Sequence, residues 1–345
     1  MRNTLALMSL TAAFVAAPIS NAAHAPQKHD SARPTLTNPI LPSGPDPFIL
    51  THDGWFYFTA TRGDRLAIRR TRDLGKLAEA EEVVVWRPAA TGDHAISIWA
   101  PELHRFDGKW FMYFTAAAAG HDDDAHRGVF VLENDAADPL TGRWVDRGRV
   151  DTALPGIDGT VFEARGRRWF AYSAYDGPDS VLMIAPLANP WTLATPAVTI
   201  ARPDQPWERQ GGRQILEGPE FLAGPKGDLF LAYSASACWS DDYALGLLRL
   251  RPGADSMIPA NWTKAPRPVL AKVPGNDVYA PGHNAFFTAN GGRETWIAYH
   301  ANQGAGVGCG AKRSPRVQRM RWASDGTPIF PVPARAGQRV EAPLP

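Results

Sequence analysis

The chain has 345 residues, which is enough for one large domain or two ordinary ones. Its 36 Lys and Arg nearly balance its 35 Asp and Glu, and without basic blocks this composition gives no electrostatic case for binding nucleic acid or an anionic membrane. We therefore expect a small uncharged partner or a neutral polymer. The 12 Trp, 31 Gly and 31 Pro residues indicate a turn-rich β protein with aromatic surfaces.

Residues 1–25 have the features of a secretory signal peptide. A basic start at Arg2 is followed by an apolar run, and the segment ends in Ala-His-Ala, the A-x-A pattern of a cleavage site. A membrane anchor is the alternative interpretation, although the apolar run is short for a span. We therefore predict a periplasmic or secreted protein with no membrane partner after cleavage. Residues 26–38 are expected to form an N-terminal linker.

An internal repeat of one strand follows along the chain. Its copies share a Gly-containing polar turn and then a mixture of aromatic and apolar residues, which is typical of strands. They are GWFYFTA (54–60), KWFMYFTA (109–116), RRWFAYSA (167–174), DLFLAYSA (228–235) and ETWIAYHA (294–301). Each copy lies between two further strand-like runs, and no unit has a sustained helical period. Repeats of this size made only of strands predict a five-bladed β-propeller over residues 39–335, with a C-terminal tail at 336–345. A β-sandwich is the weaker alternative.

The first strand of each repeat begins near an ionisable residue. These residues are Asp46, Glu102, Asp158, the pair Glu217 and Glu220, and His283. A single such residue is usually a solvated turn residue, but in a propeller the first strands converge on the central axis. Carboxyl groups that share an axial cavity push their pKa values apart, so that one stays protonated while another is ionised. Such a pair is what cleavage of a glycosidic bond requires.

The motifs around these residues resemble those of glycoside hydrolase family 43, which comprises five-bladed arabinan- and xylan-degrading enzymes. The motifs are PDPF (45–48), IWAPELH (98–104), GIDGTVF (156–162), LEGPEF (216–221), YAPGHNAFF (279–287) and RSPRVQRMRW (313–322), in the order of the family. The chain looks most similar to the members that are α-L-arabinofuranosidases or exo-arabinanases.

The resemblance implies a role for several residues. Asp46 matches the general base that activates water, Glu217 the general acid, and Asp158 the third carboxylate, which raises the pKa of the acid. The family inverts the anomeric centre, which requires a gap of roughly 6.5–9.5 Å between base and acid. His283 matches an axial histidine beside a water-ligated calcium, and Arg316 matches an arginine that binds the sugar. No cofactor is implied for the chemistry itself.

Other residues have two readings each. Trp99 is either a platform for a sugar ring or a packed core residue, and Glu102 either touches substrate or supports the strand. The loop at 120–128 holds His and Asp residues without the spacing of a known metal site, so it is either solvated or a border of the cleft. Cys238 and Cys309 follow equivalent strands of neighbouring repeats, and we expect a disulfide rather than two free thiols.

The sequence as a whole therefore predicts an inverting glycosidase that releases L-arabinose from arabinan or arabinoxylan oligosaccharides of plant cell walls. A β-xylosidase or endo-arabinanase of the same family is the alternative, and a non-catalytic sugar-binding propeller is a third. Two glutamates compete for the role of acid. Glu220 aligns with Glu102 in the repeat, whereas the resemblance selects Glu217. Residues three apart in a strand point to opposite faces unless the intervening Gly-Pro bends the chain.

Overall fold

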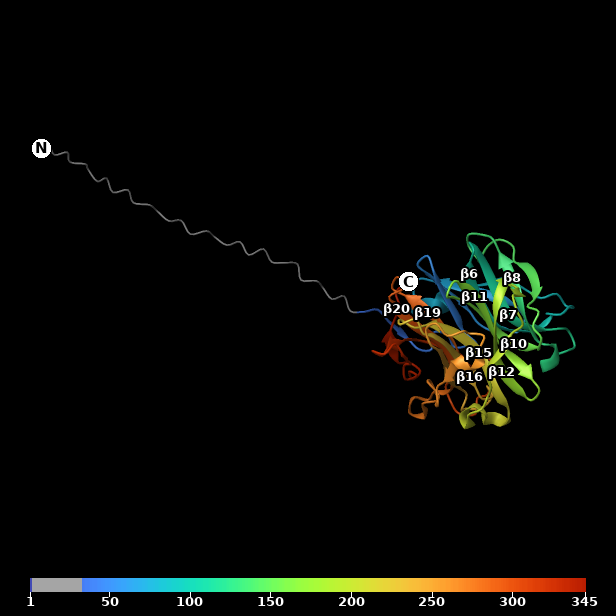
Figure 1. Ribbon diagram of the computed structural model, residues 1–345. Helices are drawn as coiled ribbons and strands as arrows, with labels where there is room; N and C mark the ends of the chain where they lie inside the picture. The colour runs from blue at the N-terminus through green and yellow to red at the C-terminus, as the bar shows by residue number, and fades with distance from the viewer. Residues whose placement is uncertain (2–32) are drawn as a thin grey trace. The chain divides into compact units, whose positions relative to one another are not determined.

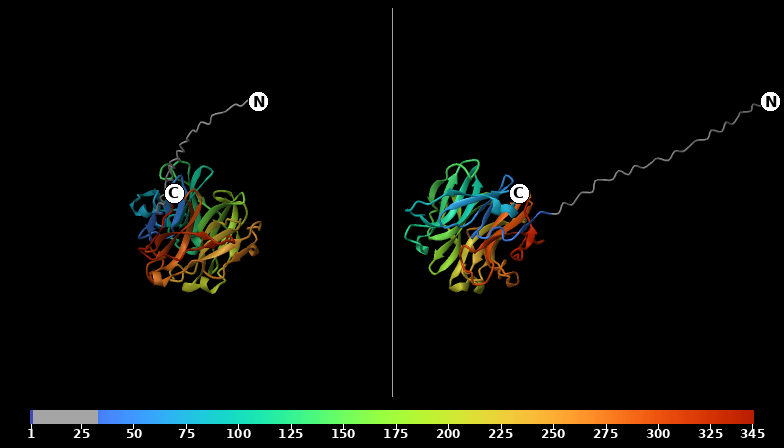
Figure 2. Two further views of the ribbon diagram at one scale, coloured as in Figure 1. Left: turned by 90° about the vertical axis from the view of Figure 1, so that its left-hand side faces the viewer. Right: turned by 180° about the vertical axis from the view of Figure 1, so that it is seen from behind.

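The structure, a computed structural model, describes Met1 and residues 33–345. Apart from Met1, the predicted signal peptide lies outside the described residues. Residues 33–345 form one unit whose antiparallel sheets are arranged as the blades of a five-bladed β-propeller, which confirms the predicted fold class. The colour of the ribbon runs once around the ring of sheets, from blue through green to red (Figures 1 and 2).

The strands of each blade follow one another in chain order. Blade one contains β2 (Phe48–His52), β3 (Trp55–Thr59), β4 (Leu66–Thr71) and β5 (Glu82–Trp86). Blade two contains β6 (Ile96–Phe106), β7 (Lys109–Ala117), β8 (Gly128–Asn134) and β9 (Val145–Arg149). Blade three contains β10 (Gly156–Ala164), β11 (Arg167–Asp176), β12 (Asp179–Asn189) and β14 (Val198–Ala201), with β13 (Thr192–Leu193) also paired to β12. Blade four contains β15 (Gln214–Ala223), β16 (Leu229–Ala235), β17 (Ala244–Leu250) and β18 (Trp262–Lys264). Blade five contains β19 (Tyr279–Ala289), β20 (Glu294–Asn302) and β21 (Ser314–Arg319).

The remaining elements are short. Two more strands, β22 (Arg321–Trp322) and β23 (Pro328–Ile329), pair with each other after blade five. The helical turns are η1 (Leu74–Glu79), η2 (Asp124–His126), η3 (Pro206–Glu208), η4 (Gln210–Gly212), η5 (Pro259–Asn261) and η6 (Pro274–Asn276). They all lie in connections between strands.

The core consists of apolar layers between neighbouring blades. Because each blade is covered on both faces, its second strand is buried along most of its length rather than at alternate residues. The aromatic residue shared by the five repeats enters a different layer in each blade and is buried there. These residues are Phe58, Phe114, Tyr172, Tyr233 and Tyr299. The layer between blades five and one, which contains Phe58 and Trp296, closes the ring.

The ends of the described chain meet at this closure. Strand β1 (Thr35–Thr37) pairs antiparallel with β24 (Arg339–Glu341), and the Asn38 side chain bonds both the N–H and the C=O of Val317 in β21. The boundaries drawn from the sequence differ here, because they place β1 in a linker and β24 in a tail. Three-residue strands are too short to show an alternating pattern, and their pairing partners lie at opposite ends of the chain.

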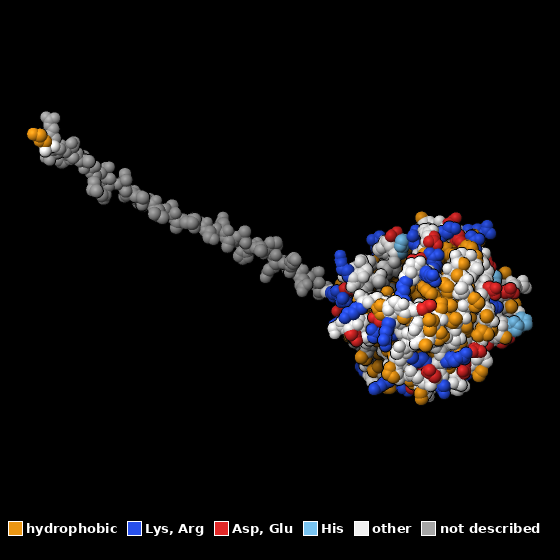
Figure 3. Space-filling view, in the orientation of Figure 1, with side chains coloured by type: hydrophobic (Ala, Val, Ile, Leu, Met, Phe, Trp, Pro, Cys, Tyr) orange, Lys and Arg blue, Asp and Glu red, His pale blue; other side chains and the backbone are white. Residues whose placement is uncertain are grey.

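The face of the molecule in Figure 3 shows no segregation of charge. On the face in Figure 3, basic and acidic side chains are interspersed among apolar and neutral ones. Within the described residues, the structure has no helix that is long and apolar enough to cross a membrane.

Candidate active site

Each blade contributes its first strand to the axis, where β2, β6, β10, β15 and β19 contact one another. Each of these segments is bent at one equivalent residue with a left-handed backbone. The bent residues are Asp46, Ala100, Asp158, Gly218 and His283, with φ angles of 55°, 44°, 54°, 53° and 46°. In β6, β10, β15 and β19 the pairing register also shifts at this point. Non-glycine residues adopt this conformation at a cost and only where the surrounding structure enforces it, which is common at functional sites.

The bends are held by hydrogen bonds between neighbouring blades. The N–H of Asp158 donates to Thr115 Oγ1 at 2.9 Å, that of His283 to Ser234 Oγ at 2.7 Å, and that of Asp46 to His300 Nδ1 at 3.1 Å. Thr115, Ser234 and His300 occupy the same position of the repeat, one residue after the shared aromatic. The second strand of one blade therefore fixes the bend in the first strand of the next.

The bends converge on a cavity of about 500 Å³ at one end of the axis. Its lining includes all three predicted catalytic acids together with His283 and Trp99. The three carboxyl groups are buried: Asp46 is 7% exposed and Asp158 is 6% exposed, and Glu217 has a partly buried side chain. Buried carboxyl groups of this kind either pair with a cation or hold a proton.

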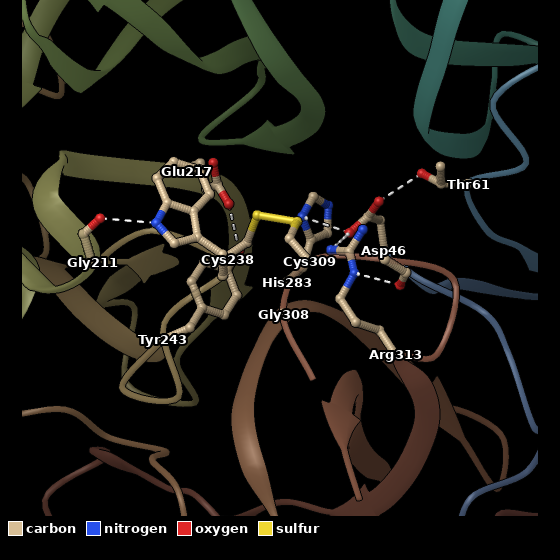
Figure 4. Close-up of a disulfide and its surroundings, with 12 residues drawn as sticks. Asp46, Thr61, Gly211, Glu217, Cys238, Tyr243, His283, Gly308, Cys309 and Arg313 are labelled. Atoms are coloured by element: carbon tan, nitrogen blue, oxygen red, sulfur yellow. Dashed lines mark hydrogen bonds and ion pairs between the residues drawn. A yellow bond between two sulfur atoms is a disulfide. The ribbon is translucent and has the colours of Figure 1, made fainter. Parts of the chain in front are cut away.

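Asp46 is the carboxyl group with the most cationic surroundings. Its Oδ1 accepts a hydrogen bond from Arg313 Nη1 at 2.8 Å, and its Oδ2 accepts one from Thr61 Oγ1 at 2.6 Å (Figure 4). Burial by itself raises the pKa of Asp46, but the charges of Arg313 and His283 outweigh burial and hold that pKa well below its ordinary value. Asp46 is therefore an ionised carboxylate at neutral pH.

Glu217 has surroundings that favour its protonated form. Burial raises its pKa above the ordinary value, and the carboxylate of Asp46 adds to this effect. Tyr243 opposes the increase, because its hydroxyl donates a hydrogen bond to Glu217 Oε1 at 2.7 Å (Figure 4). Tyr243 is fully buried and packs against Gly282, where an added Cβ would lie 2.2 Å from the Tyr243 ring.

Asp158 lies between these two groups. Burial raises its pKa to about 7, with His283 opposing and the charges of Glu217 and Asp46 adding to the increase. Its Oδ2 accepts a hydrogen bond from the N–H of Gly218, the residue after Glu217, at 3.0 Å. Asp158 therefore fixes the backbone that carries Glu217, and the charge of Glu217 in turn raises the pKa of Asp158.

His283 faces the carboxylates rather than a cation. Its Nδ1 lies 3.4 Å from Asp46 Oδ1 and 3.9 Å from Asp158 Oδ2. Burial lowers the pKa of His283, but the nearby carboxylates outweigh burial and raise it. Because imidazole is a poor direct ligand for calcium, the contact with an axial ion that the resemblance implies would run through water, with Nδ1 facing Asp46 and Asp158. We therefore assign Nδ1 to the carboxylates and route no step through a cation.

Trp99 lines the cavity from blade two. The guanidinium of Arg127 lies 4.5 Å from the centre of its ring and is itself held by Asp122 and Asp124. Both acids belong to the loop at 120–128, of which Asp124 and Arg127 line the cavity, so this loop borders the cleft. His121, Asp123 and His126 of the same loop come within 4.8 Å of one another, but all three are exposed.

Glu102 and Glu220 lie outside the cavity of the catalytic acids. Neither lines the cavity that contains Asp46. Both follow the bend in their strands and lie farther along the axis, where Glu102 Oε2 is 2.8 Å from His104 Nε2. Burial and the neighbouring Glu102 raise the pKa of Glu220 well above its ordinary value. Of the two readings of Glu102, its absence from the lining of this cavity favours the role of supporting the strand. The left-handed Gly218 bends β15 between the two glutamates, and Glu217 lines the cavity whereas Glu220 does not.

The arginine of the cavity is Arg313, not Arg316. Arg316 is fully buried inside blade five and does not line the cavity, so its assignment to sugar binding is corrected. Arg313 precedes β21, and its backbone N–H and Nε both donate to Gly310 O at 3.2 Å. This contact directs its guanidinium onto Asp46. The two arginines are three residues apart, and they differ because Arg313 precedes β21 whereas Arg316 lies within it.

Cys238 and Cys309 form a disulfide at the rim of the same cavity, with an S–S distance of 2.07 Å. It joins the loop after β16 to the loop after β20 (Figure 4). Cys309 is the residue before Gly310, which positions Arg313. The disulfide therefore connects blades four and five directly above the site.

Sequence reasoning missed Thr61 and Tyr243, and it chose Arg316 over the neighbouring Arg313; all three of Thr61, Tyr243 and Arg313 contact the acids. A signal existed for Arg313, because it lies in the same RSPR motif as Arg316. Tyr243 opens a strand that reads as an ordinary apolar run, and Thr61 follows a repeated strand without any distinguishing neighbour. Their roles depend on contacts between blades.

Three comparisons with known proteins agree with this geometry. The sequence model of the family described as "Glycosyl hydrolases family 43" matches residues 36–328. The chain is 42% identical over 284 residues to an extracellular exo-α-(1→5)-L-arabinofuranosidase of Streptomyces chartreusis, covering 80% of this chain and 85% of that protein. It is 38% identical over 313 residues to α-L-arabinofuranosidase 43 of Humicola insolens, covering 87% of this chain but only 64% of that protein.

A solved structure supports the same relationship. The α-L-arabinofuranosidase of Lactobacillus brevis is similar with a TM-score of 0.82 at 34% sequence identity, over 88% of this chain and 98% of that one. The family match spans most of the described residues, and the acids of the matched motifs meet in one cavity. The chain is therefore a glycosidase that belongs to glycosyl hydrolases family 43.

Proposed function

We propose that the protein is an α-L-arabinofuranosidase that releases L-arabinose from arabino-oligosaccharides or from the side chains of arabinan or arabinoxylan. The observation that carries the chemistry is one cavity in which Asp46 is ionised while Glu217 and Asp158 have raised pKa values. The arabinose specificity is supported by the names of the related enzymes from Streptomyces and Humicola. Those from Streptomyces are described as extracellular, which supports a periplasmic or secreted location for this protein.

The proposed reaction is a single displacement with inversion. Asp46 accepts a proton from a water molecule as the water attacks the anomeric carbon. Glu217 donates its proton to the departing glycosidic oxygen, so that the leaving group departs as an alcohol. As Glu217 becomes a carboxylate, the hydrogen bond from Tyr243 stabilises the developing charge. Asp158 accepts the N–H of Gly218 and so holds the backbone beside Glu217 in position.

Arg313 and His283 support the base. Both contact Asp46 Oδ1, while Thr61 contacts Oδ2, so the orientation of the carboxylate is fixed from two sides. Fixed orientation matters because a misplaced base costs far more than its intrinsic basicity. A sugar hydroxyl in the −1 position would find Arg313 already in place as a hydrogen-bond donor.

Two measurements test this proposal. Proton NMR during cleavage of an aryl α-L-arabinofuranoside should show the inverted anomer first, and net retention would refute the single displacement. Glu217→Gln should lose about 10²–10⁴-fold in kcat on substrates with poor leaving groups, but much less on a dinitrophenyl arabinoside, which needs no acid. Product sizes from debranched arabinan and hydrolysis of xylobiose distinguish the arabinofuranosidase from an endo-arabinanase or a β-xylosidase.

A further inference from the structure

Trp239 is unusual among the aromatic residues of residues 33–345. With 49% of its surface exposed, it is the one Trp, Phe or Tyr in this part of the chain that is classed as exposed. Its side chain lines the cavity of the catalytic acids. An exposed indole that lines a cavity leaves an aromatic face free to contact the apolar face of a bound ring.

The indole is held in its exposed position by two independent constraints. Its Nε1 donates a hydrogen bond to Gly211 O at 2.8 Å. The preceding residue, Cys238, is tied to Cys309 across the rim by the disulfide. Gly211 adopts φ = 81°, and an added Cβ there would lie 3.3 Å from the Trp239 Nε1. The surrounding loop is therefore shaped around the indole.

The location of Trp239 relates it to the general acid. Trp239 and Tyr243 lie four residues apart in the loop between β16 and β17, and Tyr243 holds Glu217. In Figure 4, Glu217, Tyr243 and Gly211 lie to one side of the disulfide, whereas Asp46 and Arg313 lie to the other. In a single displacement the acid contacts the leaving oxygen and the base contacts the opposite face. Trp239 is therefore on the side of the leaving group.

Trp99, the other tryptophan of the cavity, is less suited to this role. One face of its ring is covered by the guanidinium of Arg127, 4.5 Å from the ring centre. It belongs to blade two, whereas Glu217 and Trp239 both belong to blade four. The geometry thus separates a covered tryptophan from an exposed one beside the acid.

We propose that Trp239 is the stacking platform for the sugar ring that leaves during the reaction, and that the Cys238–Cys309 disulfide keeps the indole in place. This inference rests on the proposed arabinofuranosidase function. The enzyme should then prefer substrates whose leaving group is itself a sugar ring, since the apolar face of such a ring is stabilised by burial against the indole. Small leaving groups gain nothing from Trp239.

The test compares two substrates that differ only in the leaving group. α-L-Arabinofuranosyl fluoride has no leaving sugar, whereas α-1,5-linked arabinobiose has one. In Trp239→Ala, kcat/KM for arabinobiose should fall about tenfold, which corresponds to the loss of one aromatic contact, while that for the fluoride stays within about twofold. Trp239→Phe should restore part of the lost activity on arabinobiose. Trp55→Ala, in blade one outside the cavity, is the control and should leave the ratio of the two substrates unchanged.

The possible outcomes are distinct. Equal losses on both substrates, or no loss on either, would refute the role of Trp239. A wild-type enzyme that cleaves neither substrate would refute the proposed function and this inference with it. The Cys238→Ser/Cys309→Ser variant should lower the ratio of kcat/KM for arabinobiose to that for the fluoride, because the indole is no longer held in place. Any effect of the lost disulfide through Arg313 applies equally to both substrates and leaves this ratio unchanged. An unchanged ratio in that variant would refute the role given to the disulfide. Thermal unfolding of each variant identifies losses that come from misfolding.

Discussion

Replacing Tyr243 by Phe removes one hydroxyl from a buried position and leaves the ring against Gly282 in place. The hydroxyl donates to Glu217 at 2.7 Å, and a hydrogen bond to the charged form of an acid lowers its pKa. In Tyr243→Phe the pKa of Glu217 should therefore rise further. Since the acid must be protonated for catalysis, the alkaline limb of the kcat–pH profile should move to higher pH.

The rate should fall as well. The hydrogen bond strengthens as Glu217 becomes a carboxylate in the transition state. A hydrogen bond to a charged group contributes about 1.5–3 kcal/mol, which corresponds to a fall of roughly 10- to 100-fold in kcat if the whole contribution is lost. The assay is the pH dependence of kcat on an alkyl arabinofuranoside, whose leaving group needs the acid, beside a dinitrophenyl arabinofuranoside, which does not.

Tyr233→Phe is a matched control for this variant. Tyr233 lies in the same blade and is equally buried, and its hydroxyl also donates to a carboxylate, Glu208, at 2.7 Å, but it does not line the cavity. It should lower stability without moving the pH profile. The reasoning about Tyr243 is refuted if the alkaline limb of Tyr243→Phe stays in place or moves to lower pH, or if both substrates lose activity equally.

Three further variants test the structure around the site. Asp158→Asn should flatten the pH dependence of the free energy of unfolding. The pKa of Asp158 is about 7 in the folded protein and 3.8 ordinarily, so the folded wild type binds this proton more tightly than the unfolded chain does. The wild type therefore loses up to about 4 kcal/mol of stability as the pH rises from about 4 to 7. Urea unfolding at pH 5 and pH 8 measures this, and parallel pH curves for wild type and variant would contradict it. Gly282→Ala should reduce turnover of alkyl arabinofuranosides, since its Cβ would meet the Tyr243 ring at 2.2 Å, whereas Gly275→Ala, with open space around it, should not. Reduction of the disulfide, whose cysteines are 71 residues apart, should lower the free energy of unfolding by up to about 4 kcal/mol, and unfolding curves that coincide with and without reductant would argue against this.

Most of the fold could be predicted from the repeat in the sequence. The five copies of one aromatic strand, each preceded by a turn, are local patterns that the sequence shows directly. A strand in the middle of a buried blade needs only such an aromatic and apolar run. The same repeat predicted that ionisable residues gather on the axis, and Asp46, Asp158, Glu217 and His283 do line one cavity.

The choice between the two glutamates of QILEGPEFLAG shows where the sequence alone stopped. Repeat alignment pairs Glu220 with Glu102, and the structure places that pair together, farther along the axis than the cavity. The bent residue of β15 is Gly218, equivalent to Asp46, Asp158 and His283 in the other blades. Glu217 thus occupies a position of the repeat that carries no acid elsewhere, and no alignment of the repeats selects it.

The sequence by itself therefore predicted the propeller and the pairing of the cysteines, because these follow from patterns within single blades or from residue types, whereas the choice of Glu217 needed the family resemblance. Only the tertiary structure decided that Arg313 rather than Arg316 meets Asp46, that Tyr243 holds Glu217, and that Trp239 stays exposed. Each of these contacts joins segments that are distant in the chain or depends on a backbone bend. A left-handed residue reverses the direction of every side chain after it, and nothing in the strand's alternation records where that reversal occurs.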